Sequence, residues 1–366
     1  MEHVALGLKV KDALGICDLS RHQYYYQPTG KKPGPPASMI TQKREGQKIV
    51  EVDNKEVVEK IKENQLDFEL CYGYQKMTKE LQLQGYYINK KKVYRIMNEN
   101  QFLRPKVKIT GKTYVKFRKV CPLGLYEVME MDIKFKWIES TMSYAYILTI
   151  LDVFSRKVLN WHVGMSITQH TVRAIWEEII INHLQPYDTL NRGVRLEIRN
   201  DNDKRFSAHS VQKFFRENYI DQVFTRPYSP QENGHVESFH SILGSSIDGV
   251  DFYNLIDLER HLVLFYEKYN NARLHSSIAN LSPNIFIEQW EKGNILQCVD
   301  WDRKQTKFKL IIPYQEVFNT SGNVNQREAS CLDWEPLNGA SNPGKVSGAI
   351  TVFDTSVQRS PSVASC

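Results

Sequence analysis

Three carboxylates occupy positions where the chain should bury them or bring them to the edge of a sheet. Asp132 is flanked by Met131 and Ile133 in an alternating segment that predicts a strand. An aspartate buried there is unfavourable unless another charge compensates it. Asp201 follows directly after a second predicted strand, at the edge where α/β sheets usually carry their sites. Glu237 lies early in a later helix, with 35 residues between it and Asp201.

Carboxylates grouped at one site suit the cutting and joining of phosphodiester bonds. The reaction needs a water or a 3'-hydroxyl attacking in line, and stabilisation of the charge on the leaving oxygen. Two Mg²⁺ ions about 4 Å apart supply both, and hard cations prefer carboxylate oxygens. We expect Asp132 to bridge the two ions, Asp201 to hold one and Glu237 to hold the other, with Mn²⁺ as a possible substitute.

The elements that must position these carboxylates follow a regular order. Alternation predicts strands at 126–137, 144–151, 158–163, 194–199 and 223–226. Helical spacing predicts helices at 168–182, 208–218, from about 230, at 255–271 and at 283–291. This order predicts an α/β, RNase H-like fold in which helices flank a mixed five-stranded sheet. A single aspartate in a strand is more often structural than catalytic, but the triple is specific because its spacing agrees with this order.

The region before this fold is helical and basic. Apolar spacing predicts short helices between 54 and 104, interrupted by Gly85. In a helix-turn-helix the later helix enters the major groove of DNA, and the last helix here is basic. Its candidates for DNA contact are Lys90, Lys91, Lys92 and Arg95. The alternative is a generic three-helix bundle with a solvated basic face.

Charge is distributed unevenly along the chain. Residues 1–121 hold 24 Lys and Arg against 13 Asp and Glu, whereas the remainder holds 24 against 29. A basic front half favours a polyanion such as double-stranded DNA, and a solvated lysine-rich surface is an equal alternative on charge alone. The stretch 105–121 predicts a basic linker whose Lys112, Lys116 and Arg118 are further candidates for phosphate contact.

Composition argues against several other classes of protein. The six cysteines are scattered and form no C-x-x-C pair, which disfavours a disulfide framework and a cysteine-based zinc module. No apolar run approaches the roughly 20 residues that span a bilayer, and we expect no signal peptide. These features predict a cytoplasmic protein without a membrane partner.

Several motifs within residues 10–292 resemble those of one known family. MEMDIKF resembles W-x-x-D-I-T-Y, RNDNDKRF resembles H-S-D-x-G-x-x-F, and RPYSPQENGHVESFHSIL resembles S-x-x-x-P-x-D-N-A-x-x-E-S-F. LTILDVFSRKVLNWHVG and YNNARLHSSIANLSPNIFIEQW resemble further core segments, and CYGYQKMTKELQLQG resembles the Y-G-Y-R-x-I helix-turn-helix. The family is that of the DDE transposases of the insertion-sequence family three (orfB) type, whose core is similar to retroviral integrases.

The resemblance implies a function and partners. It identifies Asp132, Asp201 and Glu237 as the catalytic carboxylates. It implies that the front domains bind the terminal inverted repeats of an element, and that the core cleaves the donor strand and transfers it to target DNA. It also implies a homodimer or higher oligomer on paired ends, in the cytoplasm of a bacterium and associated with its nucleoid.

Five segments are expected on this basis. The last of them is rich in Ser, Asn, Gly and Thr, especially after 319, and should be poorly ordered. The segments are an N-terminal helical piece with a Pro/Gly/Lys linker (1–53), a helix-turn-helix-like DNA-binding domain (54–104), the basic linker (105–121), the RNase H-like integrase catalytic core (122–295) and a C-terminal extension (296–366).

Two departures from the family pattern leave an alternative function open. Asp203 stands where the family usually has glycine, and an extra carboxylate would either crowd a metal ion or add a ligand. The chain after 305 has no recognised counterpart. The alternative is a catalytically impaired or domesticated DNA-binding remnant; a simple nuclease without joining activity is disfavoured by the helix-turn-helix.

Other polar residues are weaker candidates for a functional role. Asn233, His235 and Arg273 are candidates for DNA contact near the core, and helix capping or plain exposure explains them equally well. Asp152 and Arg156 either support the active site or form a turn salt bridge, and the turn is the simpler interpretation.

Overall fold

The computed structural model describes residues 6–26, 37–67, 70–103, 120–226, 233–301 and 304–318. Residues 1–39 and 40–366 form two separate compact units. The first unit holds helices α2 (Val10–Ile16) and α3 (Arg21–Tyr25). The Ser20 side chain accepts a hydrogen bond from Gln23 N–H, which fixes the start of α3. Lys112, Lys116, Arg118 and everything after 318 lie outside the described residues.

A mixed five-stranded sheet forms the centre of the second unit, as the sequence predicts. The strand order is β6-β5-β4-β7-β8. Strands β4, β5 and β6 form an antiparallel meander, whereas β7 and β8 run parallel to β4. The strands are β4 (Val128–Ile138), β5 (Ser143–Asp152), β6 (Val158–Gly164), β7 (Leu196–Asn200) and β8 (Ile220–Phe224).

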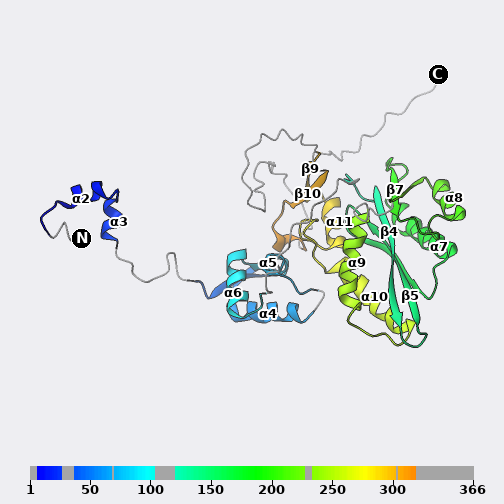
Figure 1. Cartoon of the computed structure of the whole chain (residues 1–366), viewed down its shortest axis with the longest axis horizontal. Coiled ribbons are helices and arrows are strands. Elements are labelled where there is room, and N and C mark those ends of the chain that lie inside the picture. Colours follow the sequence, from blue (N-terminus) through cyan, green and yellow to red (C-terminus); the bar gives the residue numbers. More distant parts are fainter. Residues whose placement is uncertain are drawn as a thin grey trace, which may run out of the picture. The chain divides into compact units, whose positions relative to one another are not determined.

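Helices cover both faces of this sheet (Figure 1). On one face, α7 (Gln169–Ile179) and α8 (His209–Glu217) pack on the sheet through Trp176 and Phe215. On the other face, α9 (Gly234–Ile247) and α10 (Leu255–Asn271) pack through Phe239, Leu243 and Tyr266. A short π-helix, η1 (Ile180–Leu184), extends α7, and α11 (Pro283–Glu291) joins the first of the two clusters.

The alternation of β4 decides which of its side chains reach which layer. Met129 and Met131 point into the cluster that contains α7 and α8. Ile138 points into the cluster that contains α9 and α10. Because successive side chains of a strand point to opposite faces, Glu130 and Asp132 share the face of Ile138. The sheet therefore directs both carboxylates toward α9.

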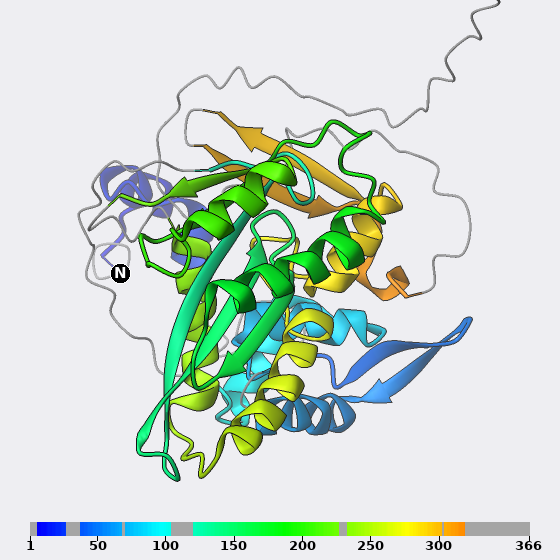
Figure 2. The same ribbon diagram turned by 90° about the vertical axis from the view of Figure 1, so that its right-hand side faces the viewer.

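Residues 40–103 form a front module around a separate core (Figure 2). The predicted helices are present as α4 (Asn54–Leu66), α5 (Tyr74–Leu83) and α6 (Lys90–Glu99). A hairpin of β1 (Ile40–Glu45) and β2 (Lys48–Asp53) precedes them, in a segment for which the sequence predicted only a helical piece and a linker.

The hairpin is held by a contact that is distant in sequence. Strand β1 also pairs with the two-residue strand β3 (Tyr86–Tyr87), which follows the break at Gly85. Gly85 has a φ of +92°, and a Cβ there would lie 2.9 Å from the carbonyl oxygen of Arg44. Only glycine fits this approach, so the residue that interrupts the helical pattern also allows the three strands to meet.

The front module contacts the core through the segment after α10. Leu274 is buried among the module's apolar side chains. Its backbone N–H donates to the hydroxyl of Tyr72 at 2.9 Å, and its carbonyl accepts from Lys76 Nζ at 3.0 Å. Burial lowers the pKa of Lys76 to about 8, with the charge of Arg273 as a smaller cause. Both polar groups of one core residue are thus satisfied by the module.

The beginning of the C-terminal extension is ordered, which corrects the expectation for 296–366 over its first part. Strands β9 (Ile295–Asp300) and β10 (Gln305–Leu310) pair antiparallel, and a 3-10 turn, η3 (Tyr314–Glu316), follows. Phe308 packs against Phe154 and Phe286 of the core. The polar composition of the tail concealed the few apolar residues that anchor its start. Among the described helices, none is long and apolar enough to cross a membrane.

Candidate active site

Two of the predicted carboxylates lie level with each other on neighbouring strands. Strands β4 and β7 are parallel, and Glu130 pairs with Arg199. Asp132 and Asp201 each follow two residues after that pair, Asp132 within β4 and Asp201 directly after the end of β7. Asp132 is half-buried and Asp201 is exposed. The sheet register alone therefore brings these two side chains to the same height.

Glu237 approaches from the helix layer. It lies in the first turn of α9, on the side of the sheet toward which Asp132 points, and it is exposed. One turn further along the helix, His240 Nδ1 lies 3.3 Å from Asp132 Oδ2. The Nε2 of His240 is buried without a hydrogen-bond partner. Because His240 follows Glu237 by three residues, its contact with Asp132 places the start of α9 beside the carboxylate of β4.

The charge of Asp132 acts on both of the other carboxylates. Burial, and secondly the charge of Asp132, raise the pKa of Glu237. Burial also raises the pKa of Asp201, the charges of Asp132 and Asp203 add to the rise, and a hydrogen bond from Asp203 N–H opposes it. Negative charge is therefore concentrated around Asp132, which is an unfavourable arrangement in the absence of a cation.

These residues fit divalent metal ions in donor type and in charge. Hard cations take carboxylate oxygens, and a cation would relieve the repulsion that raises both pKa values. Within the described residues, no three His, Cys, Asp or Glu side chains converge closely enough to hold one ion. An arrangement of two ions needs only pairs that share Asp132, and the charge of Asp132 acts on both partners.

Asp203, the departure from the family pattern, is paired with Arg205. Its carboxylate binds the guanidinium of Arg205 through both oxygens, at 2.8 and 2.5 Å. Its backbone N–H donates to Asp201 Oδ1 at 3.1 Å. The hydrogen bond with Arg205 lowers the pKa of Asp203. Arg205 also lies over the ring of Tyr146, at 5.1 Å from its centroid. The extra charge is compensated by a neighbour that sequence reasoning did not single out.

The structure separates the candidates for DNA contact into groups. On α6, Lys90 and Lys91 are exposed, whereas Lys92 Nζ donates to the carbonyl of Ile40 at 2.5 Å and Arg95 lies 3.8 Å from Glu99. Within the first turn of α9, Asn233 is buried and His235 binds Glu130. Arg273 precedes Leu274 at the contact with the front module.

Asp152 is a turn residue, as the simpler interpretation predicted, although the turn is not held by a salt bridge to Arg156. Asp152 is fully buried and accepts from Tyr126 N–H and from both the N–H and the hydroxyl of Ser155. Its partners hold the turn between β5 and β6.

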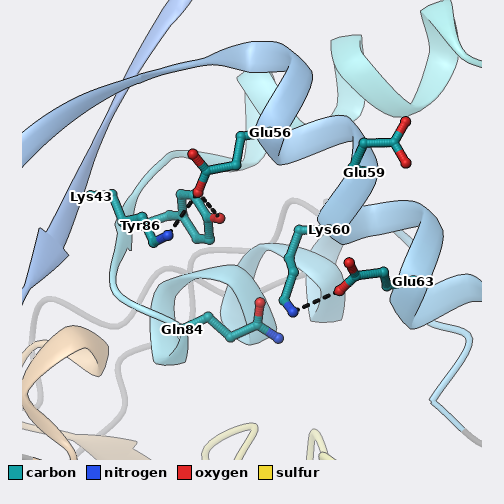
Figure 3. A pocket seen from close by; sticks show the side chains of 7 residues that line it. All are labelled: Lys43, Glu56, Glu59, Lys60, Glu63, Gln84 and Tyr86. Carbon is teal, nitrogen blue, oxygen red and sulfur yellow. Dashed lines mark hydrogen bonds and ion pairs between the residues drawn. The ribbon is translucent and has the colours of Figure 1, made fainter.

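A hollow of about 320 Å³ lies elsewhere, on the front module (Figure 3). Its two lysines pair with glutamates of the same hollow, Lys43 with Glu56 and Lys60 with Glu63.

Replacing Asp201 should stabilise the protein in the absence of metal. The folded-state pKa of Asp201 is raised, so its ionised form opposes folding at neutral pH, and this effect disappears as the pH falls through that pKa. We expect Asp201→Asn to raise the melting temperature at pH 7.5 without metal, and the gain to shrink toward pH 4. Mg²⁺ should stabilise the wild type more than the variant.

Thermal melts with and without Mg²⁺ test this expectation. Asp251→Asn, at an exposed aspartate after α9, is the matched control and should change neither quantity. A variant at Asp201 that melts below the wild type without metal would show that the site is not under electrostatic strain.

The Asp203–Arg205 pair should behave as one unit. Arg205→Ala leaves the charge of Asp203 uncompensated beside Asp201 and makes the site more negative, so we expect less Mg²⁺ to be needed for half-maximal DNA cleavage. Asp203→Gly combined with Arg205→Ala should restore the wild-type requirement, and Asp203→Gly alone should change it little. A magnesium titration of the four proteins measures the coupling. Equal requirements for Arg205→Ala and the double variant would refute it.

Family models match most of the folded part of the chain. Residues 124–230 and 218–283 match two models described as integrase core domain, and residues 51–108 match an HTH-like domain. These ranges cover the five-stranded sheet with the helices on both its faces, and the three helices of the front module.

Two curated relatives are insertion-sequence transposases. The IS150 transposase InsK of Escherichia coli (strain K12) is 25% identical over 224 residues, which are 58% of this chain and 76% of the relative. The IS904 transposase of Lactococcus lactis subsp. lactis (strain IL1403) is 24% identical over 144 residues, 38% of this chain and 54% of the relative. The catalytic core of BIV integrase is a solved structure with 21% identity and a TM-score of 0.33, covering 46% of this chain and 98% of that one.

The two kinds of domain occur here in the order that the motifs predict, and both curated relatives carry the function that the resemblance implied. The chain is therefore similar to insertion-sequence transposases and carries an integrase core domain preceded by an HTH-like domain.

Proposed function

We propose that this transposase cuts DNA at the ends of an insertion sequence and joins those ends to target DNA, using divalent metal ions. The observation that carries this proposal is the placement of the carboxylates. Asp132 lies on β4, Asp201 directly follows the neighbouring parallel strand β7, and Glu237 lies in the first turn of α9. Burial, together with the charge of Asp132, raises the pKa of Asp201 and that of Glu237.

Each carboxylate has a defined part in this chemistry. Asp132 would help to hold both of two Mg²⁺ ions, or of Mn²⁺ ions in their place, with Asp201 as a further ligand of one ion and Glu237 of the other. The ions, when bound, activate the attacking hydroxyl and stabilise the charge on the leaving oxygen. The chain's own contribution is to hold the three oxygen donors on rigid elements, two at the level of one sheet register and one at a helix terminus.

The front module is suited to reading the ends of the element. Helix α6 is the last helix of the module, where a helix-turn-helix places its recognition helix, and Lys90 and Lys91 at its start are exposed. Side chains of this kind contact phosphates and position the reader on the duplex. Cutting and joining two ends together also requires at least two copies of the chain, so we propose a homodimer or larger assembly on paired ends, acting on chromosomal DNA in the cytoplasm.

The alternative of a catalytically impaired remnant is not favoured. Its support in the sequence was Asp203 and the unfamiliar end of the chain. The carboxylate of Asp203 pairs with Arg205, and the start of the C-terminal extension packs into the core through Phe308 and Leu310. Neither feature removes a carboxylate from the site.

Loss of Asp132 should abolish catalysis without abolishing DNA binding. Asp132 is shared by both proposed ion sites, so Asp132→Ala should reduce cleavage and joining on the order of 10²–10³-fold, as for loss of a principal stabiliser of transition-state charge. The assay uses labelled DNA carrying the ends that flank the coding sequence, with Mg²⁺ or Mn²⁺. A wild-type protein that binds these ends but neither cuts nor joins them would contradict the proposed function.

Charge removal on α6 should weaken binding in a salt-dependent manner. Each of Lys90→Ala and Lys91→Ala should reduce the slope of log affinity against log salt by about one, because one phosphate contact is lost. Binding of labelled ends is measured by fluorescence anisotropy between low and physiological salt. Lys55→Ala, at an exposed lysine of α4, is the matched control. An unchanged slope in both α6 variants would exclude this face from the DNA interface.

A further inference from the structure

A fourth carboxylate lies beside the site and belongs to none of the proposed metal pairs. Glu130 is fully buried on β4, two residues before Asp132, with a relative exposure of 0%. A carboxylate in the interior is unfavourable unless hydrogen bonds or charges satisfy it. Its burial between Met129 and Met131 in the central strand therefore calls for a structural reason.

Both oxygens of Glu130 are occupied by the first turn of α9. The backbone N–H groups of His235 and Val236 donate to Oε2 at 2.9 and 2.8 Å. The Nδ1 of His235 lies 2.8 Å from Oε1, and because a carboxylate only accepts, Nδ1 carries the donated proton. One side chain thus receives three hydrogen bonds from two consecutive residues of the helix.

Glu130, a residue of a distant strand, accepts the backbone hydrogen bonds that the N-cap residue of a helix normally accepts. The first N–H groups of a helix have no partner inside it and are usually bound by the side chain of the N-cap. The N-cap of α9 is Asn233, whose side chain makes no capping hydrogen bond. Its Nδ2 instead points to the carbonyl of Met131, at 3.5 Å. A negative charge at this end of the helix is also favoured by the helix dipole.

The contact links the two elements that carry metal-binding candidates. Glu130 and Asp132 lie on the same face of β4 because they are two residues apart. Glu237 directly follows Val236, whose N–H is held by Glu130. The distance and direction from Asp132 to Glu237 are therefore set through one carboxylate that itself points away from solvent.

We propose that Glu130 is a positioning residue of the transposase reaction. Glu130 docks the first turn of α9 onto β4, with His235 as its side-chain partner, and so fixes Glu237 relative to Asp132. This inference rests on the proposed function for its catalytic consequence and on the hydrogen bonds alone for its structural one. Partners of this kind behind metal-binding side chains typically change metal affinity or activity 10–100-fold when they are replaced.

Glu130→Gln is the informative substitution, because it keeps the shape of the side chain but replaces one acceptor oxygen with a donor NH₂ group. We expect the amides at the start of α9 to exchange hydrogen faster, on the order of tenfold, while the rest of the sheet keeps its protection. We also expect the Mg²⁺ concentration for half-maximal cleavage to rise on the order of tenfold, with binding to DNA ends unchanged.

Two further variants separate positioning from general damage. Glu127→Gln is the matched control, since Glu127 accepts a hydrogen bond from Leu123 N–H at 2.7 Å, just before β4 and not on α9. It should leave both readouts unchanged. Glu130→Asp keeps the charge but is one methylene shorter, so it should show the same direction of change as Glu130→Gln if contact, and not charge alone, is what matters. Glu130→Asp also takes the place of Glu130→Gln as the test variant if Glu130→Gln fails to fold.

The two arms of the experiment distinguish the possible failures. Exchange at α9 and a magnesium requirement equal to those of Glu127→Gln would overturn the inference. Exchange that increases uniformly, without a selective effect on α9 or on the magnesium requirement, would reduce Glu130 to a general stabiliser and also overturn it. If the wild type does not cleave, the proposed function fails, and the exchange measurement still decides whether Glu130 docks the helix.

Discussion

The packing of α9 on β4 is the interaction on which the site depends. Asp132 is held within a central strand, paired on one side with β5 and close to β7 on the other. Glu237 has no such frame of its own, because it stands in the first turn of a helix. Phe239 and Leu243 fix the body of the helix in the apolar layer, and the polar contacts of β4 with the first turn fix its end. Without both, a helix could slide or fray and carry the carboxylate with it.

This arrangement stores electrostatic repulsion where the fold is otherwise most rigid. Asp132 lies on β4, Asp201 follows β7 and Glu237 lies on α9, and the pKa values of Asp201 and Glu237 are raised by burial and by the charge of Asp132. The strands and helices that carry them are stabilised by two large apolar clusters on opposite faces of the sheet. The favourable packing of the apolar clusters offsets the unfavourable repulsion among the carboxylates. Such a balance is common where activity and stability compete.

Much of the core could be predicted from the sequence, because period and spacing determine it. The alternation around Asp132, the order of strands and helices and the 35-residue gap placed the carboxylates correctly on a strand, after a strand and on a helix. What could not be predicted are pairings across long distances in the chain. Glu130 meets residues 105 and 106 positions later, and β1 meets β3 through a glycine that reads locally as a helix break. The two-residue spacing of Glu130 and Asp132 was the available signal for a shared face.

The burial of Leu274 in the front module has a mechanical consequence. The module does not merely precede the core along the chain, since it packs around Leu274, three residues after the end of α10. Helix α10 shares an apolar cluster with α9, which carries Glu237. Under the proposed function, a force that bound DNA exerts on the module would be transmitted through α10 to α9, and so to Glu237 at the start of α9.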